Sequence, residues 1–489
     1  MKQSIYIFAS LLFFLISCKE NKKGTSEEKK EQSELYKDID EYIHTVQKRY
    51  SIPGIACAII KDGQVVFQNN YGYANLEHQV PVSDNSIFRL YSLTKPIVSV
   101  GVFSLIEEGK LNLEDKVSEY LSDVPDDWKG IQIRHLLSCS SGLPDMVQPY
   151  NEIKDLNEEE IKKRCFSLPL NFKAGERFEY SQTNFWILQK IVEKVSKMSI
   201  SDFIIKRQFA YNTGSVIFSS DARDIIKNRA TSYFPFSKGT MTIEHPYYLG
   251  DYSYSMNGLN VTLQDLIEWD KRFNSQKLIK KKTIDLMWKS YPFSNSDDLF
   301  AYGWGKFSSS NYLSYGFTGT GCTLYRNFPE KNLSIIFLAN GFSIWHNMDY
   351  LSNNLANIID RNIVDNDALF SEKLLSSFSK GGVKLFKETY FKMKTDEKYK
   401  GIDYANHLIN IGFIFLDTEK VTESIDVFKF YTEEFSDSWY AYNCLGLALE
   451  QNNQDKKALI NYQKALELNT ENQNEYNSTL IERIERLKN

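Results

Sequence analysis

A serine and a lysine three residues apart, Ser92 and Lys95, lie in the stretch RLYSLTKPIV, which opens an apolar segment. This spacing places two side chains on one face of a helix, so the hydroxyl and the amine can touch. At a helix N-terminus the free backbone N–H groups favour an alkoxide and then an oxyanion, so such a serine can be an activated nucleophile. The same pattern recurs at Ser26 and Ser377 in polar surroundings, so spacing alone does not identify a site.

Two later stretches contain candidate partners for Ser92. The sequence RFEYSQTNFWILQKIVEKVS places Tyr180 just before a predicted helix, and YLSYGFTGTGCTLYRNF has a glycine-rich strand entry between Gly316 and Gly321. Each candidate also has a structural interpretation, with Ser92 as a helix cap and Tyr180 as a core tyrosine whose hydroxyl is satisfied. Surrounding sequence must decide between these interpretations.

The composition describes an ordinary globular protein of two or three domains. The chain has 489 residues, of which 42% are hydrophobic and 25% charged, with a formal net charge of −5. Basic runs are short, so no nucleic-acid partner is expected. The six cysteines are scattered without metal-ligand spacing, so we expect no metal site and no disulfide framework, and no cofactor is implied.

The N-terminus predicts export. A lysine at position 2 precedes an apolar run from Ile5 to Ile16 that has the length of a signal-peptide core. The following "LISC" resembles the lipobox of bacterial lipoproteins, which implies a signal peptide over 1–17 and a lipid on Cys18. The charged residues 18–35 predict a flexible tether. Lys19 after the cysteine favours the outer membrane by analogy with Gram-negative sorting, and the lipid would hold the protein at a membrane surface.

The elements that must position Ser92 are predicted to form an α+β domain over residues 36–365. Apolar residues at helical spacing predict a helix from about 36 to 50, followed by two strands around the turn pair Asp62-Gly63. Two more strands, CTLYRNF and LSIIFLAN, flank the turn PEKN, and helical signals fill the middle of the chain. Strands at both ends with helices between them indicate this fold class.

The rest of the chain predicts helices only. Residues 366–400 read as a helical connector with a break at Gly381-Gly382. Over 401–489 two segments align 34 residues apart, with Gly412 matching Gly446 and Phe428 matching Tyr462. This period resembles tetratricopeptide helix pairs, which implies a surface for a protein partner, or else an appendage that packs on the first domain.

The order of the three candidate stretches resembles that of the serine β-lactamase and penicillin-binding-protein family, especially its class C β-lactamase and esterase-like branch. Flanking text such as IQIRHLLSCSSGLPD and NGLNVTLQDLIEWDKRF fits as well, so the resemblance covers residues 36–365. It implies a β-lactamase-like antiparallel sheet flanked by helices. The three motifs are here Ser92-Leu93-Thr94-Lys95, Tyr180-Ser181-Gln182 and Phe317-Thr318-Gly319.

The resemblance implies a role for each matching residue. Ser92 is the acylated nucleophile, Lys95 lowers the barrier to its deprotonation, and Tyr180 carries the proton between nucleophile and leaving group. Backbone N–H groups of Ser92 and Thr320 form the oxyanion hole. We therefore expect both Lys95 and Tyr180 to lie at hydrogen-bond distance from the Ser92 hydroxyl, with a substrate-binding edge made by Gln182, Phe317, Thr318 and Gly319.

Two departures from the family pattern bear on the substrate. Gln182 stands where Asn is usual, and Phe317 stands where Lys or His is usual. The missing cation would bind a substrate carboxylate and act on Tyr180 electrostatically, so β-lactams and D-Ala-terminated peptides fit less well than a neutral ester or amide. Cys139 replaces a common histidine and is expected to be a small packed side chain.

Three functions remain open from the sequence. The first is an exported, lipid-anchored serine hydrolase acting through an acyl-enzyme at Ser92 on a small ester or amide, with weak or absent β-lactam turnover. The second is a non-catalytic protein that binds a partner through its pocket or repeats. The third is a penicillin-binding D,D-peptidase. Retention of Ser92, Lys95 and Tyr180 favours the first over the second, and Phe317 favours it over the third.

Overall fold

A computed structural model describes most of the chain. The described residues are 26–153, 156–209, 214–234, 241–243, 250–292, 300–309, 312–341, 348–469 and 474–488. Cys18 and the predicted signal peptide lie outside them. No helix within these ranges is long and apolar enough to cross a bilayer.

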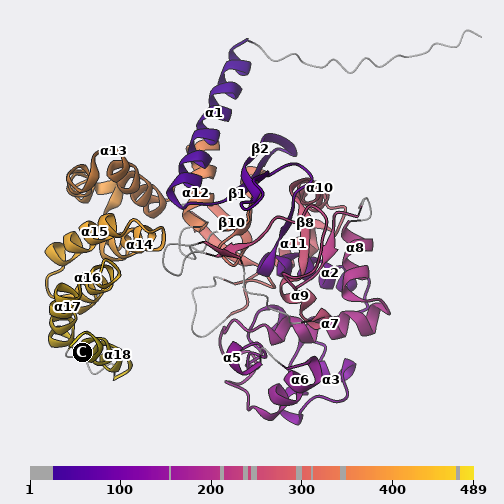
Figure 1. The fold of residues 1–489 in the computed structure, drawn as a ribbon. Coiled ribbons are helices and arrows are strands. Elements are labelled where there is room, and N and C mark those ends of the chain that lie inside the picture. Colours follow the sequence, from indigo (N-terminus) through magenta and orange to yellow (C-terminus); the bar gives the residue numbers. More distant parts are fainter. Residues whose placement is uncertain are drawn as a thin grey trace, which may run out of the picture.

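A seven-stranded antiparallel sheet joins the two ends of the first domain, as the α+β interpretation predicted (Figure 1). Its central pair brings together strands far apart in sequence, since Ile55 lies opposite Ala339. The expected turn at Asp62-Gly63 is confirmed, with φ of +51° and +75° in the two turn residues. In spatial order the strands are β3 (Val80–Pro81), β2 (Gln64–Asn75), β1 (Gly54–Lys61), β12 (Leu333–Ala339), β11 (Thr323–Phe328), β10 (Tyr312–Gly319) and β9 (Gly305–Ser309).

Both faces of this sheet are covered, which explains why β1 is a continuous apolar run. Ala56 and Ala58 point into the core that holds α2 (Thr94–Glu107) and α10 (Leu263–Asn274). Cys57 and Ile59 point to the other core, which lies under α1 (Ser26–Arg49) and α12 (Met348–Ile359). Alternate residues of a strand face opposite sides, so two cores require apolar residues at every position.

The remaining elements of the first domain surround the site. Two small sheets have the strand orders β4-β8-β5 and β6-β7. Their bounds are β4 (Ile87–Arg89), β5 (Ile217–Phe218), β6 (Tyr233–Phe234), β7 (Thr242–Ile243) and β8 (Leu259–Thr262). The other helices are α3 (Val117–Tyr120), α4 (Ile133–Leu137), α5 (Tyr150–Ile153), α6 (Glu158–Ser167), α7 (Thr183–Ser196), α8 (Ile200–Gln208), α9 (Tyr254–Asn257), α11 (Lys281–Met287) and α12 (Met348–Ile359), and the short 3-10 turns are η1 (Tyr91–Leu93), η2 (Asp126–Trp128), η3 (Asp251–Ser253) and η4 (Pro329–Lys331).

The first helix corrects the predicted tether. Helix α1 (Ser26–Arg49) begins inside the segment 18–35 that the sequence predicted to be flexible. Glu, Lys and Gln are good helix formers, and pairs such as Lys30 with Glu34 at 3.9 Å support the exposed turns. The helix extends far beyond the part whose apolar residues reach the core.

Beyond residue 365 the described chain is all-helical, and Figure 1 shows these helices as a row beside the sheet domain. The expected break at Gly381-Gly382 is confirmed by non-helical backbone inside α13. Gly412 packs against the Phe428 ring and Gly446 against the Tyr462 ring, so the two helix pairs repeat one contact. The elements are α13 (Asn366–Lys394), η5 (Glu397–Tyr399), α14 (Tyr404–Asp417), α15 (Val421–Glu434), α16 (Trp439–Gln451), α17 (Asp455–Leu468) and α18 (Asn474–Lys488).

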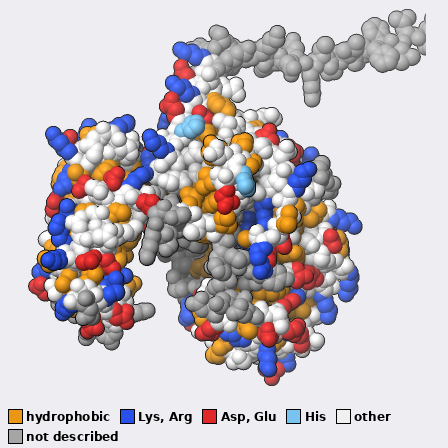
Figure 2. Space-filling model, in the orientation of Figure 1, with side chains coloured by type: hydrophobic (Ala, Val, Ile, Leu, Met, Phe, Trp, Pro, Cys, Tyr) orange, Lys and Arg blue, Asp and Glu red, His pale blue; other side chains and the backbone are white. Residues whose placement is uncertain are grey.

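The visible surface mixes charges of both signs. Figure 2 shows Lys and Arg side chains interspersed with Asp and Glu over the face that it presents. The five cysteines in the described ranges are buried and unpaired. Cys139 is among them, packed with no exposed surface and with a positive φ of 51°.

Candidate active site

Ser92 lies in a sharp turn between a strand and a helix. Strand β4 ends at Arg89, the turn η1 contains Ser92, and α2 begins at Thr94, so the serine precedes the helix rather than lying inside it. Tyr91 has a left-handed φ of 52°, a conformation that is strained for a side chain of this size. The turn leaves Ser92 partly exposed while its neighbours on both sides are buried.

Lys95 reaches the serine from the first turn of α2. Its Nζ lies 3.2 Å from the Ser92 Oγ and 2.7 Å from the carbonyl oxygen of Met256 on α9. The side chain has no exposed surface. Burial disfavours the charged amine and lowers the pKa of Lys95 to about 7, an effect that exceeds the opposing influence of Cys139 and Asp145. A neutral amine can donate to Met256 and still offer its lone pair to the serine proton.

Tyr180 reaches the serine from the other side, just before α7. Its hydroxyl donates to the Ser92 Oγ at 3.0 Å, and its ring, 37% exposed, lies 5.1 Å from the Lys95 Nζ. Desolvation raises the pKa of Tyr180 above its ordinary value, although the Ser92 hydrogen bond opposes this. The phenol is therefore protonated at neutral pH. The structure brings Ser92, Lys95 and Tyr180 together at the distances that the sequence led us to expect.

These contacts divide the acid and base roles between two residues. Lys95 can accept the Ser92 proton because its pKa lies near neutrality, whereas Tyr180 can only donate. This is a sharper assignment than the sequence resemblance implied, where Tyr180 carried the proton in both directions. The site therefore places a candidate base and a candidate acid at hydrogen-bond distance from one serine hydroxyl, an arrangement that can activate a nucleophile.

The end of β10 packs directly against the turn that contains Ser92. A Cβ on Gly319 would meet the Leu90 carbonyl oxygen at 2.0 Å, so only glycine permits this approach. The Thr323 hydroxyl donates to the same oxygen at 2.9 Å. Thr320 follows Gly319 with a left-handed φ of 49°. These contacts place the backbone of Thr320 beside the nucleophile turn, while Thr318 lies partly exposed on the same strand.

Aromatic rings surround Tyr180 on the β10 side. Phe317 stacks on Tyr180 with ring centroids 6.2 Å apart, and Phe300 meets Phe317 edge to face at 6.0 Å. Phe178 in turn lies 5.0 Å from Phe300. The position where the family has a cation is thus part of an apolar surface. Gln182 also acts on Tyr180, since its side chain opposes the rise in the Tyr180 pKa, and its buried Oε1 has no hydrogen-bond partner among the described atoms.

Sequence reasoning missed two groups that act on Lys95. One is the Met256 carbonyl, which has no side-chain signature. The other is Asp145, a partly buried carboxyl whose pKa is raised by desolvation against the influence of Lys95. Asp145 ends the quoted stretch SGLPD, so the signal for it was present in the sequence.

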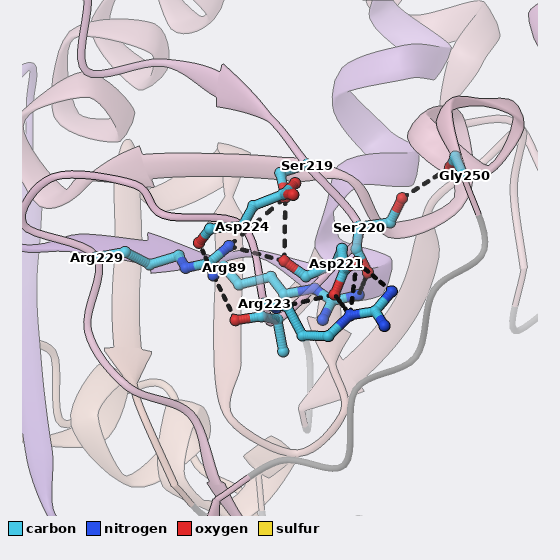
Figure 3. Close-up of polar contacts among 9 residues, drawn as sticks. Arg89, Ser219, Ser220, Asp221, Arg223, Asp224, Arg229 and Gly250 are labelled. Carbon is cyan, nitrogen blue, oxygen red and sulfur yellow. Dashed lines mark hydrogen bonds and ion pairs between the residues drawn. The ribbon is translucent and has the colours of Figure 1, made fainter.

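A polar network supports the nucleophile turn from behind. Arg89 is buried, donates to the Ser220 carbonyl oxygen at 3.0 Å and lies over the Tyr91 ring at 4.7 Å (Figure 3). The Ser220 hydroxyl accepts from Ser253 at 2.7 Å, and Ser253 is the residue before α9, which positions Met256. One chain of contacts therefore links the turn that holds Ser92 to the acceptor that holds Lys95.

The loop that accepts from Arg89 is itself braced. Figure 3 shows Arg229 reaching across this loop, where it donates to the carbonyl oxygens of Asp221 and Ala222 at 3.0 and 2.6 Å. Arg223 pairs with the Asp221 carboxylate at 2.7 Å on the outer side. Within the described ranges no cluster of three or more His, Cys, Asp or Glu has the arrangement of a metal site.

Comparison with known proteins decides the family. The sequence model of the beta-lactamase family matches residues 39–351, which contain all three motifs and every strand of the seven-stranded sheet. The chain belongs to the beta-lactamase family. As a member it is a serine hydrolase, and the three stretches that resemble the family's motifs are the ones grouped around Ser92. The all-helical segment after residue 365 lies outside the match.

Two curated relatives of this beta-lactamase-family chain match only part of their own length. Penicillin-binding protein 4* of Bacillus subtilis (strain 168) is 26% identical over 285 residues, which are 55% of this chain and 62% of the relative. Protein flp of Staphylococcus aureus (strain N315) is 31% identical over 173 residues, which are 34% of each chain. The chain therefore spans less than two thirds of either relative.

Solved structures of the family share the fold. A penicillin-binding protein homologue from Pyrococcus abyssi superposes with a TM-score of 0.60 at 22% identity, over 69% of this chain and 81% of that one. EstCE1, a hydrolase with promiscuous acyltransferase activity, has a TM-score of 0.56 at 19% identity, over 64% and 95%. A D-amino acid amidase from Ochrobactrum anthropi SV3 has a TM-score of 0.56 at 16% identity, over 68% and 99%. At these identities the likeness establishes the β-lactamase-like fold.

Proposed function

We propose that this serine hydrolase acts through an acyl-enzyme at Ser92 on a small ester or amide. The observation that carries the proposal is the double contact on one oxygen, with Lys95 Nζ at 3.2 Å and Tyr180 OH at 3.0 Å from the Ser92 Oγ. A helix cap would need neither contact. The lowered pKa of Lys95 and the raised pKa of Tyr180 supply a base and an acid for one nucleophile.

The reaction follows from these assignments. Lys95 accepts the Ser92 proton as the Oγ attacks the substrate carbonyl, and the backbone N–H groups of Ser92 and Thr320 stabilise the oxyanion. Tyr180 then donates its proton to the leaving oxygen or nitrogen, the carbonyl–leaving-group bond breaks, and the proton on Lys95 neutralises the phenolate. In deacylation Lys95 accepts a proton from water as the water attacks the acyl carbonyl, and this proton passes to the Ser92 Oγ as the carbonyl–Oγ bond breaks, which releases the acid and restores Ser92.

The other two functions are less well supported. A D,D-peptidase must bind a terminal carboxylate, and Phe317 offers an aromatic ring at the position of the family cation. One curated relative is named a penicillin-binding protein, so the D,D-peptidase function remains the second candidate. A purely binding role is supported only by the departures Gln182 and Phe317, since it gives no reason for the contacts around Ser92.

Export and anchoring complete the proposal. We propose that the signal peptide is removed, that lipid on Cys18 holds the protein in the cell envelope, and that the outer membrane is its site. The support is the sequence of the first nineteen residues alone. We also propose that the helix pairs after residue 401 are tetratricopeptide-like and offer a surface to a protein partner, supported by the repeated contacts of Gly412 and Gly446.

The test uses the chain from Lys19 onward, which keeps every described residue, and its Ser92→Ala variant. Both receive a short-chain aryl ester and a fluorescent penicillin, and product release and intact protein mass are followed. The matched control is Ser377→Ala, which removes the serine of a second Ser-x-x-Lys stretch far from the site in sequence. Ester turnover or an acyl adduct that persists in the control and vanishes in Ser92→Ala is expected.

Each other result points elsewhere. Stable penicillin labelling of Ser92 would favour the peptidase function despite Phe317. Equal and negligible activity in all proteins, with no adduct, would reject the proposal and favour a binding role.

A further inference from the structure

Three phenylalanines form a continuous cluster beside Tyr180, in which Phe178 and Phe317 are partly exposed and Phe300 is buried behind them. We call Phe178, Phe300 and Phe317 the aromatic wall. Phe317 is partly exposed on β10 and stacks on Tyr180 at an interplanar angle of 24°. Phe300 crosses Phe317 at 80°, and Phe178 lies against Phe300 at 39°. The three residues come from separate parts of the sequence, so their convergence is a property of the folded site.

The place of the wall fixes which part of a substrate meets it. Tyr180 donates to the Ser92 Oγ, and in the proposed reaction the same hydroxyl must reach the leaving atom. The group attached to that atom therefore lies on the Tyr180 side of the site. Phe317 is the ring stacked on Tyr180 there, so it is the first surface that the leaving group contacts.

We propose that the aromatic wall binds the leaving group and selects an uncharged, apolar alcohol or amine over one that has a carboxylate. This rests on the proposed acyl-enzyme function and specifies its substrate class. Aromatic rings bind apolar and aromatic groups through area and edge-to-face contact, and a carboxylate placed against them loses hydration without gaining a partner.

Three charged side chains near the wall, all within the described ranges, already have partners. Lys95 is buried and its amine serves Ser92 and Met256. Arg177, next to Phe178 in sequence, pairs with Glu179 at 3.2 Å and lies over the Phe172 ring. Lys306 on β9 lies opposite Tyr315 of β10 and donates to the Ser290 hydroxyl at 3.1 Å. Of these, Lys306 is the cation that a carboxylate could recruit by side-chain movement, so the test includes it.

The experiment compares two acetate esters that differ in leaving-group charge. Phenyl acetate and 3-carboxyphenyl acetate have the same acyl group and phenols of similar basicity, so the chemical step is matched. The full chain from Lys19 onward is assayed for kcat/KM with each ester. The native protein should prefer phenyl acetate by at least about ten-fold, the ratio expected when one ligand leaves a buried charge unpaired.

Variants assign that preference to the wall. Phe317→Lys should reverse or erase the ratio by raising kcat/KM for the carboxyphenyl ester, whereas Phe317→Leu should lower kcat/KM for phenyl acetate without helping the other ester. Phe391→Lys, at an exposed position of α13, adds the same charge away from the site and should leave the ratio unchanged. If Phe317→Lys fails to fold, Phe317→Met is measured beside Phe317→Leu. It too should lower kcat/KM for phenyl acetate without raising kcat/KM for the carboxyphenyl ester.

Several outcomes overturn the inference while leaving the proposed function intact. One is a native ratio near unity with normal Ser92 acylation. Another is an equal loss of kcat/KM for both esters in Phe317→Lys and Phe317→Leu, which would show that Phe317 only positions Tyr180. A native preference for the carboxyphenyl ester that Lys306→Met removes would assign leaving-group binding to Lys306. Absence of any Ser92 adduct would instead reject the proposed function, and the inference would fall with it.

Discussion

The chemistry proposed for Lys95 depends on its burial away from water. Lys95 has no exposed surface, its nearest rings are Tyr180 and Phe185 at 5.1 and 5.3 Å, and its hydrogen-bond acceptor is the Met256 carbonyl. None of these contacts supplies a full negative charge, so desolvation dominates and the pKa of Lys95 falls to about 7. A lysine at its ordinary pKa would stay protonated and could not accept a proton from serine.

This lowered pKa predicts how activity depends on pH. Below about 7 Lys95 is protonated and cannot accept the Ser92 proton, so kcat/KM for phenyl acetate should be low there and should rise to a plateau above it. Tyr180 should not limit activity in this range, because its pKa is raised and the phenol stays protonated. The measurement is a pH–rate profile from about pH 5 to about pH 9, a range in which we expect the protein to stay folded.

Variants of Lys95 test the assignment. Lys95→Arg retains the charge but cannot lose its proton, so kcat/KM should fall by about a hundred-fold or more at every pH, the size of a general-base contribution. If a Lys95→Ala protein retained residual activity with the same inflection near neutrality, another group would be the base.

At the scale of elements, the site depends on how a strained turn is held. The backbone of Tyr91 lies in the left-handed region, and a strained turn of this kind persists only when its surroundings oppose relaxation. Arg89 does so from β4 by covering the Tyr91 ring and donating to the Ser220 carbonyl. Through Ser253 the same contacts extend to α9. Arg89 is thus a positioning residue that touches neither substrate nor the reacting atoms.

Removal of this support should slow chemistry more than it weakens binding. We expect Arg89→Met to lower kcat for an aryl ester by about ten-fold or more with little change in KM, because a lost hydrogen bond to a charged group is worth about 1.5–3 kcal/mol. Arg89→Lys should restore part of the rate. Arg223→Gln, in the same loop but on its exposed outer side, is the matched control and should stay near native kcat. A variant that is less stable yet fully active per folded molecule would make Arg89 a structural residue only.

Much of the fold could be predicted because the sequence signals for it are local. Asp62-Gly63 specifies a hairpin turn, Gly381-Gly382 breaks a helix, and Gly412 with its repeat at Gly446 marks where an aromatic ring packs. Each of these is set by backbone conformation or contact size within a short stretch. The start of α1 was placed too late, because its first turns are polar and are stabilised by helix propensity rather than by an apolar stripe.

The parts of the site that could not be predicted are those in which residues distant in sequence come together in the fold. Ser92, Lys95 and Tyr180 could be proposed from motif order, since each has a reactive side chain in a recognisable stretch. The Met256 carbonyl is a backbone group and could not be proposed in that way. Phe178 and Phe300 are ordinary phenylalanines in the sequence, and only tertiary packing brings them to Phe317.

On the scale of the whole molecule, one hydrophobic core runs from the back of the sheet into the C-terminal helices. It includes Ile55 and Phe337 of the sheet, Phe386 and Tyr390 of α13, and residues as distant as Ile484. Tyr390 meets Phe430 of α15 edge to face at 5.0 Å. The helices after residue 401 therefore cover apolar surface that the rest of the chain would otherwise expose.

An ion pair between the buried Arg49 and the partly buried Glu372 links α1 to α13 beside this core. Arg49 donates through both terminal nitrogens to the Glu372 carboxylate, each at 2.7 Å, and is 6% exposed. Lys420, just before α15, donates to the Arg49 carbonyl oxygen at 2.8 Å. The N-terminal helix, the connector and the repeated helix pairs thus meet at one residue.

A continuous core predicts that the protein unfolds as a unit. Calorimetry of the chain from Lys19 onward should show one cooperative transition, and Glu372→Gln should shift that whole transition to lower temperature. The shift should correspond to about 3–5 kcal/mol, because removing one partner leaves the Arg49 charge buried and uncompensated. Lys37→Gln, which breaks an exposed pair with Glu41, is the control and should cost less than about 1 kcal/mol. Two resolved transitions, of which Glu372→Gln moved only one, would show instead that the C-terminal helices fold independently of the hydrolase domain.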